Sequence, residues 1–514
     1  MFENFILGIR LIAQWDIVLL IIFGTVLGLL LGAIPGLTGT LGIVLLLPIT
    51  FSMKPIAGII TLVAIYVGGM SGGLVSAALL GMPGTPASVA TTFDAFPMAK
   101  KGFPGKALAT GVLCSFMGGV LSWIVLVIAT PLLASLALKF GPFEYAMVCI
   151  FGIIVVTGMA GKGLKGAISL FLGLIVATIG FDPVGGIARL TFGIRQLRIG
   201  FSIVPVFMGM FVVAEVLSNA ERVSEKYIIT VKQDDKLIPP WIEIIKNWFN
   251  IIRSCAIGVF IGILPGIGGI VSNFVCWDVA RRSSKKPEEF GHGSIEGIIA
   301  SETGNNSSLS GAFVPLLGLG IPGCTVTAII LAGFTLHGLQ PGPVLFRDHV
   351  DLVYAIFAGM FFSNIVMVLT QFLGGMKLFI RAMQAPKWLL LPIVLAMVVA
   401  GCYATHYRIF DVYVTIGFGV IGYIMKKTGF PIAPFVFAVV LGPMIEEYLS
   451  RALMLSGGSW LPFFTKPICI VLIILTVVFS YLSVISKGGF KLKGKAPLPS
   501  VQGLPPDEDK SSQP

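Results

Sequence analysis

The sequence predicts an all-α polytopic membrane protein, on the basis of its composition, its long apolar segments and an internal repeat. Of its 514 residues, 56% are hydrophobic and only 11% are charged. Soluble domains carry about a quarter charged residues, so this chain lacks the polar surface it would need in water. A mean hydropathy of +0.96 agrees and also excludes a disordered chain.

Apolar segments of spanning length recur along the whole chain. A transmembrane helix needs about 20 apolar residues. Such stretches lie near residues 15–34, 55–80, 106–138, 141–160, 163–181, 199–220, 251–280, 309–335, 351–375, 388–404, 409–425, 429–446 and 463–486. They predict about 12 membrane segments. Between and after them we expect a cytoplasmic polar linker at 221–250, a polar stretch at 281–308 and a disordered cytoplasmic tail at 487–514.

Two glycine- and proline-rich motifs occur twice, in the same order. Gly28-x-x-x-Gly32-x-x-Pro35-Gly36-x-x-Gly39 recurs 230 residues later as Gly258-x-x-x-Gly262-x-x-Pro265-Gly266-x-x-Gly269. Ser71-Gly72, followed by Pro83-Gly84, recurs 239 residues later as Ser310-Gly311 and Pro322-Gly323. The chain therefore reads as a duplicated unit. We expect one membrane repeat with its scaffold helices in residues 1–220 and the other in residues 251–486.

The positions of the cations indicate that the two repeats are inverted. In the first half the cations follow the second motif, at Lys100, Lys101 and Lys106. In the second half they lie between the motifs, at Arg281, Arg282, Lys285 and Lys286. Because positive loops face the cytoplasm, the halves should insert in opposite orientations, as in many secondary transporters. Arg189, Arg195 and Arg198 do not fit this pattern, so either the segment near 182–200 is re-entrant or the helix count is off by one.

Each Pro-Gly pair lies inside an apolar run, where it should interrupt a helix. Segment 251–280 offers only about 14 residues on each side of Pro265-Gly266, too few for two spans. We therefore predict a re-entrant helical hairpin that enters from the cytoplasmic side, with segment 21–50 as its mirror image. Unpaired backbone at membrane depth is tolerated only where it is packed in protein or lines a cavity.

The interrupted segments are the predicted transport site. Restarting helix N-termini, hydroxyls and amides suit carboxylates, and exposed carbonyls suit Na⁺. The predicted substrate-binding residues are Thr38, Thr40, Ser71, Pro83, Gly84, Thr85, Ser88, Asn305, Asn306, Ser310, Pro322, Gly323, Thr325 and Thr327. The predicted ion-coupling residues are Pro35, Gly36, Pro265, Gly266 and Glu302, with Na⁺ held by backbone carbonyls near the Pro-Gly pairs.

Simpler interpretations stand beside these assignments. The spaced glycines Gly28, Gly32, Gly258 and Gly262 indicate close helix packing. Asn305 and Asn306 fit a solvated loop as well as a site, and Glu302 fits a surface carboxylate. Asp94 is expected to face the cytoplasm beside Lys100. The scattered cysteines indicate small apolar residues inside helices.

Enzymatic and nucleic-acid functions find no support in the sequence. No P-loop, C-x-x-C or H-E-x-x-H motif is present. The G-x-G-x-x-G match at 318–323 lacks a β-α-β context, and the G-x-S-x-G match at 69–73 is not repeated in the second half. The net charge of +11 is spread over short loops, not gathered in a patch. We expect no enzyme, no cofactor and no nucleic-acid partner.

The motifs resemble one known family, the large permease subunit of tripartite tricarboxylate transporters. The matching segments are 32–42, 48–51, 81–86 and Glu302-x-x-Asn305-Asn306 through Pro322-Gly323. The resemblance covers about residues 15 to 485 and departs from the family at the polar pair Ser307-Ser308. It implies a multi-pass protein of the bacterial inner membrane that works with a small membrane subunit and a periplasmic solute-binding protein.

The function expected from both sources is import of di- or tricarboxylates, such as citrate-like anions, by symport with Na⁺ or H⁺. The bilayer and the organic carboxylate are then its other partners, and a homo-oligomer is left open. Two alternatives stay open as well: a transporter of another small organic solute, and a passive anion channel.

Overall fold

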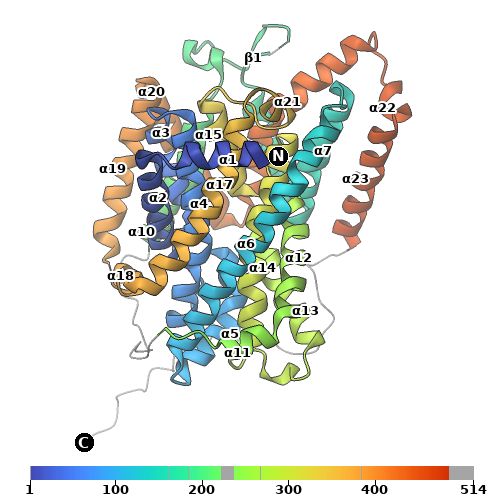
Figure 1. The fold of residues 1–514 in the computed structure, drawn as a ribbon. Helices are drawn as coiled ribbons and strands as arrows, with labels where there is room; N and C mark the ends of the chain where they lie inside the picture. The colour runs from blue at the N-terminus through green and yellow to red at the C-terminus, as the bar shows by residue number, and fades with distance from the viewer. Residues whose placement is uncertain are drawn as a thin grey trace, which may run out of the picture.

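The computed structural model describes residues 2–160, 162–182, 184–221, 237–266, 268–383 and 385–485, and these are almost entirely helical (Figure 1). Half of the linker predicted at 221–250, namely 222–236, and the whole tail predicted at 487–514 lie outside the described residues.

The first half holds a short pair of strands, β1 (Gly180–Phe181) and β2 (Ala188–Arg189), among its helices. These helices are α1 (Phe2–Ile12), α2 (Trp15–Ala33), α3 (Gly39–Phe51), α4 (Pro55–Leu80), η1 (Pro86–Ser88), α5 (Val89–Lys100), α6 (Pro104–Ala137), α7 (Pro142–Met159), α8 (Leu164–Ala177), η2 (Arg195–Ile199), α9 (Ile203–Phe207), η3 (Met208–Val213) and α10 (Ala214–Ala220).

The second half is helical throughout its described residues. Its helices are α11 (Trp241–Lys246), α12 (Trp248–Ile263), α13 (Gly268–Ser283), η4 (Pro287–Glu289), α14 (Ile295–Leu319), α15 (Thr325–Leu336), α16 (Pro343–Asp348), α17 (Val350–Thr370), η5 (Gln371–Gly375), α18 (Met376–Met383), α19 (Lys387–His406), α20 (Ile409–Thr428), α21 (Ile432–Leu455), α22 (Leu461–Thr465) and α23 (Pro467–Ile485).

The helices confirm the polytopic membrane class. Within the described residues, nine helices are long and apolar enough to cross a membrane, and several shorter apolar helices accompany them. The span predicted at 309–335 is wrong: α14 begins at Ile295, and a non-helical segment separates it from α15. The polar residues 295–308 belong to a buried helix, because they face other helices instead of water.

Both Pro-Gly motifs of the first kind form helical hairpins. Helix α2 turns back into α3, and α12 turns back into α13. Gly36 and Gly266 carry these turns with φ of 88° and 81°, a conformation that favours glycine. In Figure 1, α3 lies near the upper end of the molecule and α13 near the lower end. The two hairpins therefore enter from opposite ends, as an inverted repeat requires.

Close helix packing explains the spaced glycines. Helix α2 packs on α4, and α12 packs on α14. A Cβ on Gly32 would lie 2.5 Å from the Gly69 carbonyl oxygen, and one on Gly258 would lie 2.7 Å from that of Gly304. Real Cβ atoms do not approach this closely, so the packing interpretation is confirmed.

We predict that Gly262→Leu removes folded protein. A Cβ at Gly262 would press on the Ser308 carbonyl and lie 3.0 Å from the Gly311 Cα, so α12 would have to leave α14. The matched control is Gly417→Leu in α20, where nothing lies within 4 Å of the added Cβ. Membrane yield and detergent gel filtration measure the effect. Equal monodisperse yields for the two variants would contradict the packing role of Gly262.

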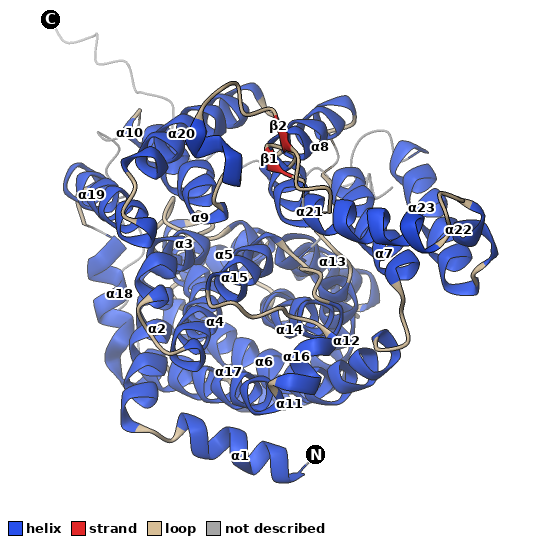
Figure 2. Ribbon diagram, turned by 90° about the horizontal axis from the view of Figure 1, so that it is seen from above, coloured by secondary structure: helices blue, strands red, loops and turns tan. Residues whose placement is uncertain are grey.

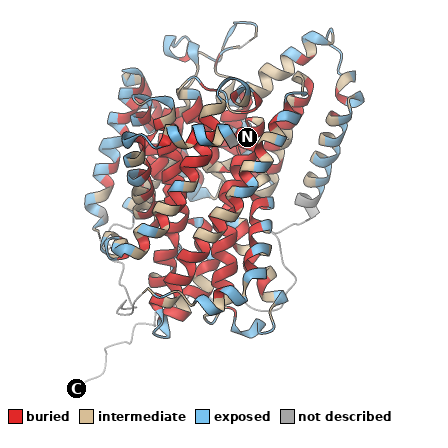
Figure 3. Ribbon diagram, in the orientation of Figure 1, coloured by how far each residue is buried: buried red, intermediate tan, exposed pale blue. Residues whose placement is uncertain are grey.

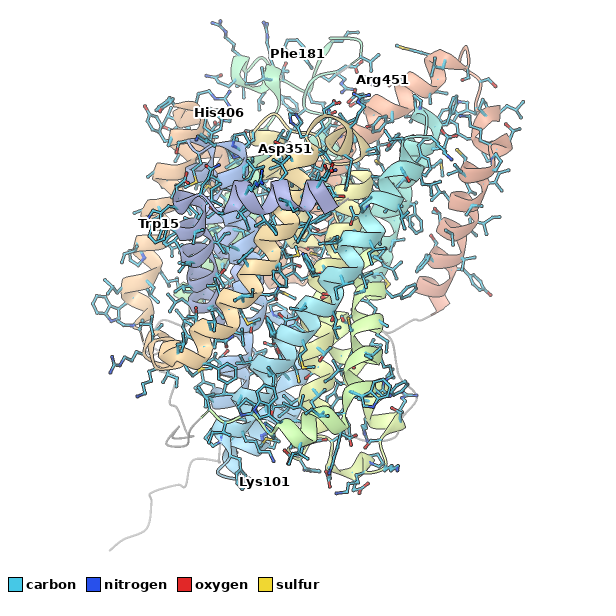
Figure 4. All side chains as sticks on the ribbon, in the orientation of Figure 1. Trp15, Lys101, Phe181, Asp351, His406 and Arg451 are labelled. Carbon is cyan, nitrogen blue, oxygen red and sulfur yellow. The ribbon has the colours of Figure 1, made fainter. Side chains whose placement is uncertain are left out.

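Cations of both halves meet at one end of the molecule. Lys101 and Lys106 of the first half and Lys286 of the second line a single cleft of about 490 Å³. Figure 4 shows Lys101 at the lower end. This juxtaposition is what the inverted arrangement predicts, and the positive-inside rule assigns this end to the cytoplasm.

The re-entrant alternative for the segment near 182–200 is wrong. Strands β1 and β2 pair antiparallel there, with Gly180 opposite Arg189. The strands project at the end opposite Lys101 (Figures 1 and 4). Arg189 forms an ion pair with Glu446 of α21, so one of the unexpected cations is neutralised locally.

The remaining helices surround a buried centre. Seen from above, α4, α6, α14 and α17 group together, while α7, α8, α19, α20, α21 and α23 lie outside them (Figure 2). Burial is concentrated in the central helices (Figure 3). The outer helices carry exposed apolar side chains such as Phe171, Ile393 and Val477, as a surface in contact with lipid should.

Candidate substrate and ion site

The second Pro-Gly motifs produce two equivalent interruptions, which we call the first break (residues 81–88) and the second break (residues 320–327). Helices α4 and α14 end on glycines with φ of 67° and 76°, Gly81 and Gly320. The Ser88 hydroxyl accepts from the Thr85 N–H and donates to the Thr85 carbonyl. Thr327 makes the same two bonds with Cys324. Ser88 and Thr327 thus shape the helix starts, and their hydroxyls are already used.

The turns of the two helical hairpins contact other elements, and the turn of the second hairpin contacts the second break. The Gly266 N–H donates to the Gly323 carbonyl at 2.8 Å, which joins the second hairpin to the second break. Gly266 also lies against Val156 of α7, and Gly36 lies against Asn219 of α10. Both turns therefore sit where the central helices meet the outer ones.

Asn305 of the second repeat lies close to the first break. Its Nδ2 donates to the Met70 carbonyl of α4 at 3.3 Å, and its Oδ1 is buried without a partner. A Cβ placed on Gly269 would lie 3.0 Å from both that Oδ1 and the Ala87 Cβ. The amide oxygen therefore points at the contact between the second hairpin and the first break. The buried Thr85 hydroxyl of that break also has no partner.

Glu302 is a fully buried carboxylate at 0% exposure. The Thr91 hydroxyl donates to its Oε1 at 2.5 Å, and the Ser115 hydroxyl donates to its Oε2 at 2.7 Å. Among the described residues it forms no ion pair with Lys, Arg or His. The surface-carboxylate interpretation is therefore wrong. A buried carboxylate held only by neutral donors is costly when charged, and such groups in membrane proteins are functional by default.

Asn273 of α13 ties this carboxylate to the first break. Its Oδ1 accepts from the Ala90 N–H at the start of α5, and its Nδ2 donates to Thr91 and to the Ser301 carbonyl. The hydroxyl that holds Glu302 therefore sits in the first turn of the helix that restarts after the first break. The Thr91 hydroxyl thus connects the Glu302 carboxylate to the first break.

The other predicted residues bond to their own helix or to a neighbouring helix, or lie half-buried in the first turn of a helix. Asn306, in the middle of α14 and not in a solvated loop, donates to the Glu302 carbonyl of its own helix. Ser71 accepts from Gln371, and Ser310 accepts from Ser122. Thr38 caps α3, while Thr40 and Thr325 are half-buried in the first turns of α3 and α15. The structure does not bring these residues to the first break.

The two breaks differ in exposure. At the first break Met82 is 39% exposed and Pro83 is exposed, although Gly84 is buried. At the second break Ile321 is 1% exposed, and Pro322 and Gly323 are also buried. Equivalent segments of the duplicated unit thus occupy different environments.

Asp94 is a further buried carboxylate, and the expectation that it faces the cytoplasm is wrong. Its Oδ1 accepts from the N–H groups of Gly291, Gly293 and Ser294, and its Oδ2 accepts from Trp277 Nε1 at 2.7 Å. These bonds clamp α5 of the first repeat to the loop before α14 of the second. Sequence reasoning missed this role because a loop of another repeat provides the donors.

The predicted Na⁺ ligands are backbone carbonyls at the Pro-Gly pairs. The described part of the chain has no group of three His, Cys, Asp or Glu suited to a metal ion. Of the carbonyls at the Pro-Gly pairs, that of Gly323 is engaged by Gly266 and that of Gly36 by Asn219. Carbonyl coordination of Na⁺ stays a prediction. All seven cysteines are buried and free, as expected.

Sequence reasoning also missed Tyr66, Ser115 and Asn273. The 239-residue offset places Tyr66 opposite Asn305, and its hydroxyl lies 3.2 Å from Cys324 Sγ at the second break. The same offset places Val63 opposite Glu302, so the carboxylate has no counterpart in the first repeat. Applying the repeat to the polar residues of α14 would have revealed Tyr66; no sequence signal identifies Ser115 or Asn273.

Comparisons with known proteins agree with this architecture. Residues 18–437 match the family described as Tripartite tricarboxylate transporter TctA family. An uncharacterized 52.8 kDa protein from the TAR-I ttuC' 3' region of Agrobacterium vitis is 38% identical over 451 residues, which cover 87% of this chain and 88% of that protein. A second uncharacterized protein, from the TAR-II ttuC' 3' region of the same organism, is 37% identical over 211 residues, or 41% of this chain and 87% of that protein. No solved structure matches the chain. The match over residues 18–437 shows that the chain belongs to the tripartite tricarboxylate transporter TctA family.

Proposed function

We propose that this permease imports di- or tricarboxylates across the bacterial inner membrane by symport with a cation, and that Glu302 is the coupling group. The observation that carries the proposal is the buried carboxylate of Glu302, which bonds to the helix restarting after the first break. A small membrane subunit and a periplasmic solute-binding protein complete the transporter, as membership in a tripartite family implies.

The first break is the proposed substrate site. The Thr85 hydroxyl is a buried donor without a partner, and a substrate carboxylate supplies the acceptor it lacks. The Asn305 Oδ1 is a buried acceptor without a partner, which suits a substrate hydroxyl or a Na⁺ ion. Leaving either group unpaired costs about 1–3 kcal/mol, so ligand binding at this place relieves an existing penalty.

A proton is the coupling ion that Glu302 favours. Its carboxyl oxygens are held by two hydroxyls, and within the described part of the chain it belongs to no group of three His, Cys, Asp or Glu that could hold a cation. Protonation removes the cost of a buried charge without requiring further ligands. A Na⁺ ion would need several additional oxygens around the same carboxyl.

Uptake of radiolabelled citrate into proteoliposomes tests the proposal. The permease with its small subunit is reconstituted, and the solute-binding protein is added outside, with a pH gradient, a Na⁺ gradient or neither. Carboxylate symport predicts saturable, gradient-driven accumulation. Non-saturating flux that ignores both gradients would indicate the alternative, a passive anion channel. Accumulation of a solute without a carboxyl group would indicate the other alternative.

We predict that Thr85→Ala and Asn305→Ala each lower citrate uptake by about tenfold, the effect of losing about 1.4 kcal/mol of binding. Both side chains present unpartnered oxygens at the first break. The matched control is Thr92→Ala, because the Thr92 hydroxyl bonds only to the Val89 carbonyl of its own helix. Initial rates across citrate concentrations measure the change at equal protein in the liposomes. Normal rates in both site variants would refute the first break as the substrate site.

A further inference from the structure

The hairpin of β1 and β2 projects above the central helices, beside the upper end of α21, at the end opposite Lys101 (Figures 1 and 4). The hairpin and the segment that follows it expose large apolar side chains: Ile187 is 68% exposed, Phe192 is 78% exposed and Ile199 is 67% exposed. Lipid explains exposed apolar residues along the outer helices, but the hairpin projects above the upper ends of α19 and α20 (Figure 1). Exposed apolar groups in such a position mark an interaction surface.

The projecting segment is held in a defined shape. The strands pair, and Arg189 bonds to Glu446 of α21. Leu190 and Phe192 adopt φ of 50° and 47°, which is costly for residues with side chains. Such strain persists where the surrounding structure enforces it, often at binding surfaces.

The charges beside the apolar residues include both signs, but the acidic ones have partners: Asp182 accepts from the Val184 N–H within the turn, and Asp411 pairs with His406 and Arg408. Arg195 and Arg198 are exposed, and the described residues provide no ion-pair partner for either. A cleft of about 450 Å³ adjoins them, lined by Ile199, Gly200, Ser202, His406 and Arg408. Cations at the outer end run against the positive-inside tendency, so a function must favour them.

We infer that this surface, residues 184–199 with the cleft at His406 and Arg408, is the docking platform for the periplasmic solute-binding protein, which meets Arg195 and Arg198 with acidic side chains around an apolar centre. The inference rests on the proposed function, which provides the partner. An apolar centre gives affinity, and complementary charges on the rim give orientation and a fast association. A soluble partner fits because the hairpin projects above the central helices (Figure 1).

The test measures binding of the purified, ligand-loaded cognate solute-binding protein to the permease with its small subunit in nanodiscs. The double variant Arg195→Glu/Arg198→Glu should weaken binding at least about tenfold at low salt, with a smaller difference at high salt. Phe192→Asn removes the ring but tolerates a positive φ, and it should also weaken binding. The matched control reverses two exposed cations at the opposite end, Lys246→Glu/Lys285→Glu, and should bind like the wild type.

Citrate counterflow without the solute-binding protein checks that each variant is folded and should be unchanged. Equal affinities for the wild type and both platform variants would overturn the inference and leave the proposed function intact. Failure of the wild type to bind any solute-binding protein would overturn the inference together with the proposed partner. Loss of the small subunit from the platform variants, with unchanged binding of the solute-binding protein, would also overturn it.

Discussion

Glu302→Gln is expected to abolish proton-driven accumulation of carboxylate while exchange of carboxylate across the membrane continues. Gln keeps the size of the side chain and the acceptor for one hydroxyl, from Thr91 or Ser115, but it cannot gain or lose a proton. One coupled proton transfers the energy of the pH gradient, about 1.4 kcal/mol or tenfold accumulation per pH unit. The variant should therefore fill liposomes only to the external concentration.

Three measurements on the same liposomes separate coupling from binding. Counterflow reports the exchange step, uptake under a pH gradient reports coupling, and uptake under a Na⁺ gradient reports the competing ion. The matched control is Glu288→Gln, an exposed carboxyl in the loop before α14, which should behave like the wild type. Full pH-driven accumulation by Glu302→Gln, or wild-type accumulation that follows only Na⁺, would remove Glu302 as a proton site.

Asp94→Ala is expected to destabilise the permease by at least about 3 kcal/mol, because it leaves several buried donors without an acceptor. Three backbone N–H groups and the Trp277 indole N–H all donate hydrogen bonds to this one carboxylate. They belong to the second repeat, whereas Asp94 belongs to the first. The variant should therefore lose thermal stability in detergent and, with it, transport.

Asp94→Asn keeps the shape of the side chain but removes its charge and one acceptor oxygen, so it separates these two contributions to stability. Asn retains one acceptor oxygen but presents an NH₂ group to the remaining donors, so its stability should fall between those of the wild type and the alanine variant. Glu289→Ala is the matched control, since that carboxyl is exposed and pairs only with Lys286. Wild-type melting of Asp94→Ala would show that the loop before α14 does not depend on the clamp.

Much of the fold follows from local features of the sequence. Predicted span 55–80 coincides with α4, and the predicted hairpins at 21–50 and 251–280 correspond to α2–α3 and α12–α13. Membrane segments are predictable because each helix must satisfy its own backbone within the bilayer. Pro and Gly interrupt helices through their own dihedral restrictions, so Pro35-Gly36 and Pro265-Gly266 are visible without any tertiary contact.

The candidate site was less predictable, because side-chain partners come from distant segments. The sequence marked Glu302, Asn305 and Thr85, but left Asn305 open to a solvated loop and Glu302 to a surface carboxylate. The loop interpretation failed for a physical reason: a helix with a polar face survives in a membrane when other helices cover that face, and α5, α6 and α13 cover α14.

By itself, the sequence determined the membrane class, the duplication with its inversion, and the positions where helices are interrupted, because these depend on composition, periodicity and local backbone preference. Only the tertiary structure decided which polar groups meet. In the structure, Glu302 is buried between Thr91 and Ser115, and Asp94 accepts hydrogen bonds from the other repeat. The hairpin of β1 and β2 and the segment after it expose apolar side chains and the cations Arg195 and Arg198. Such hydrogen bonds join residues 187 to 211 positions apart, and no local property of either partner specifies them.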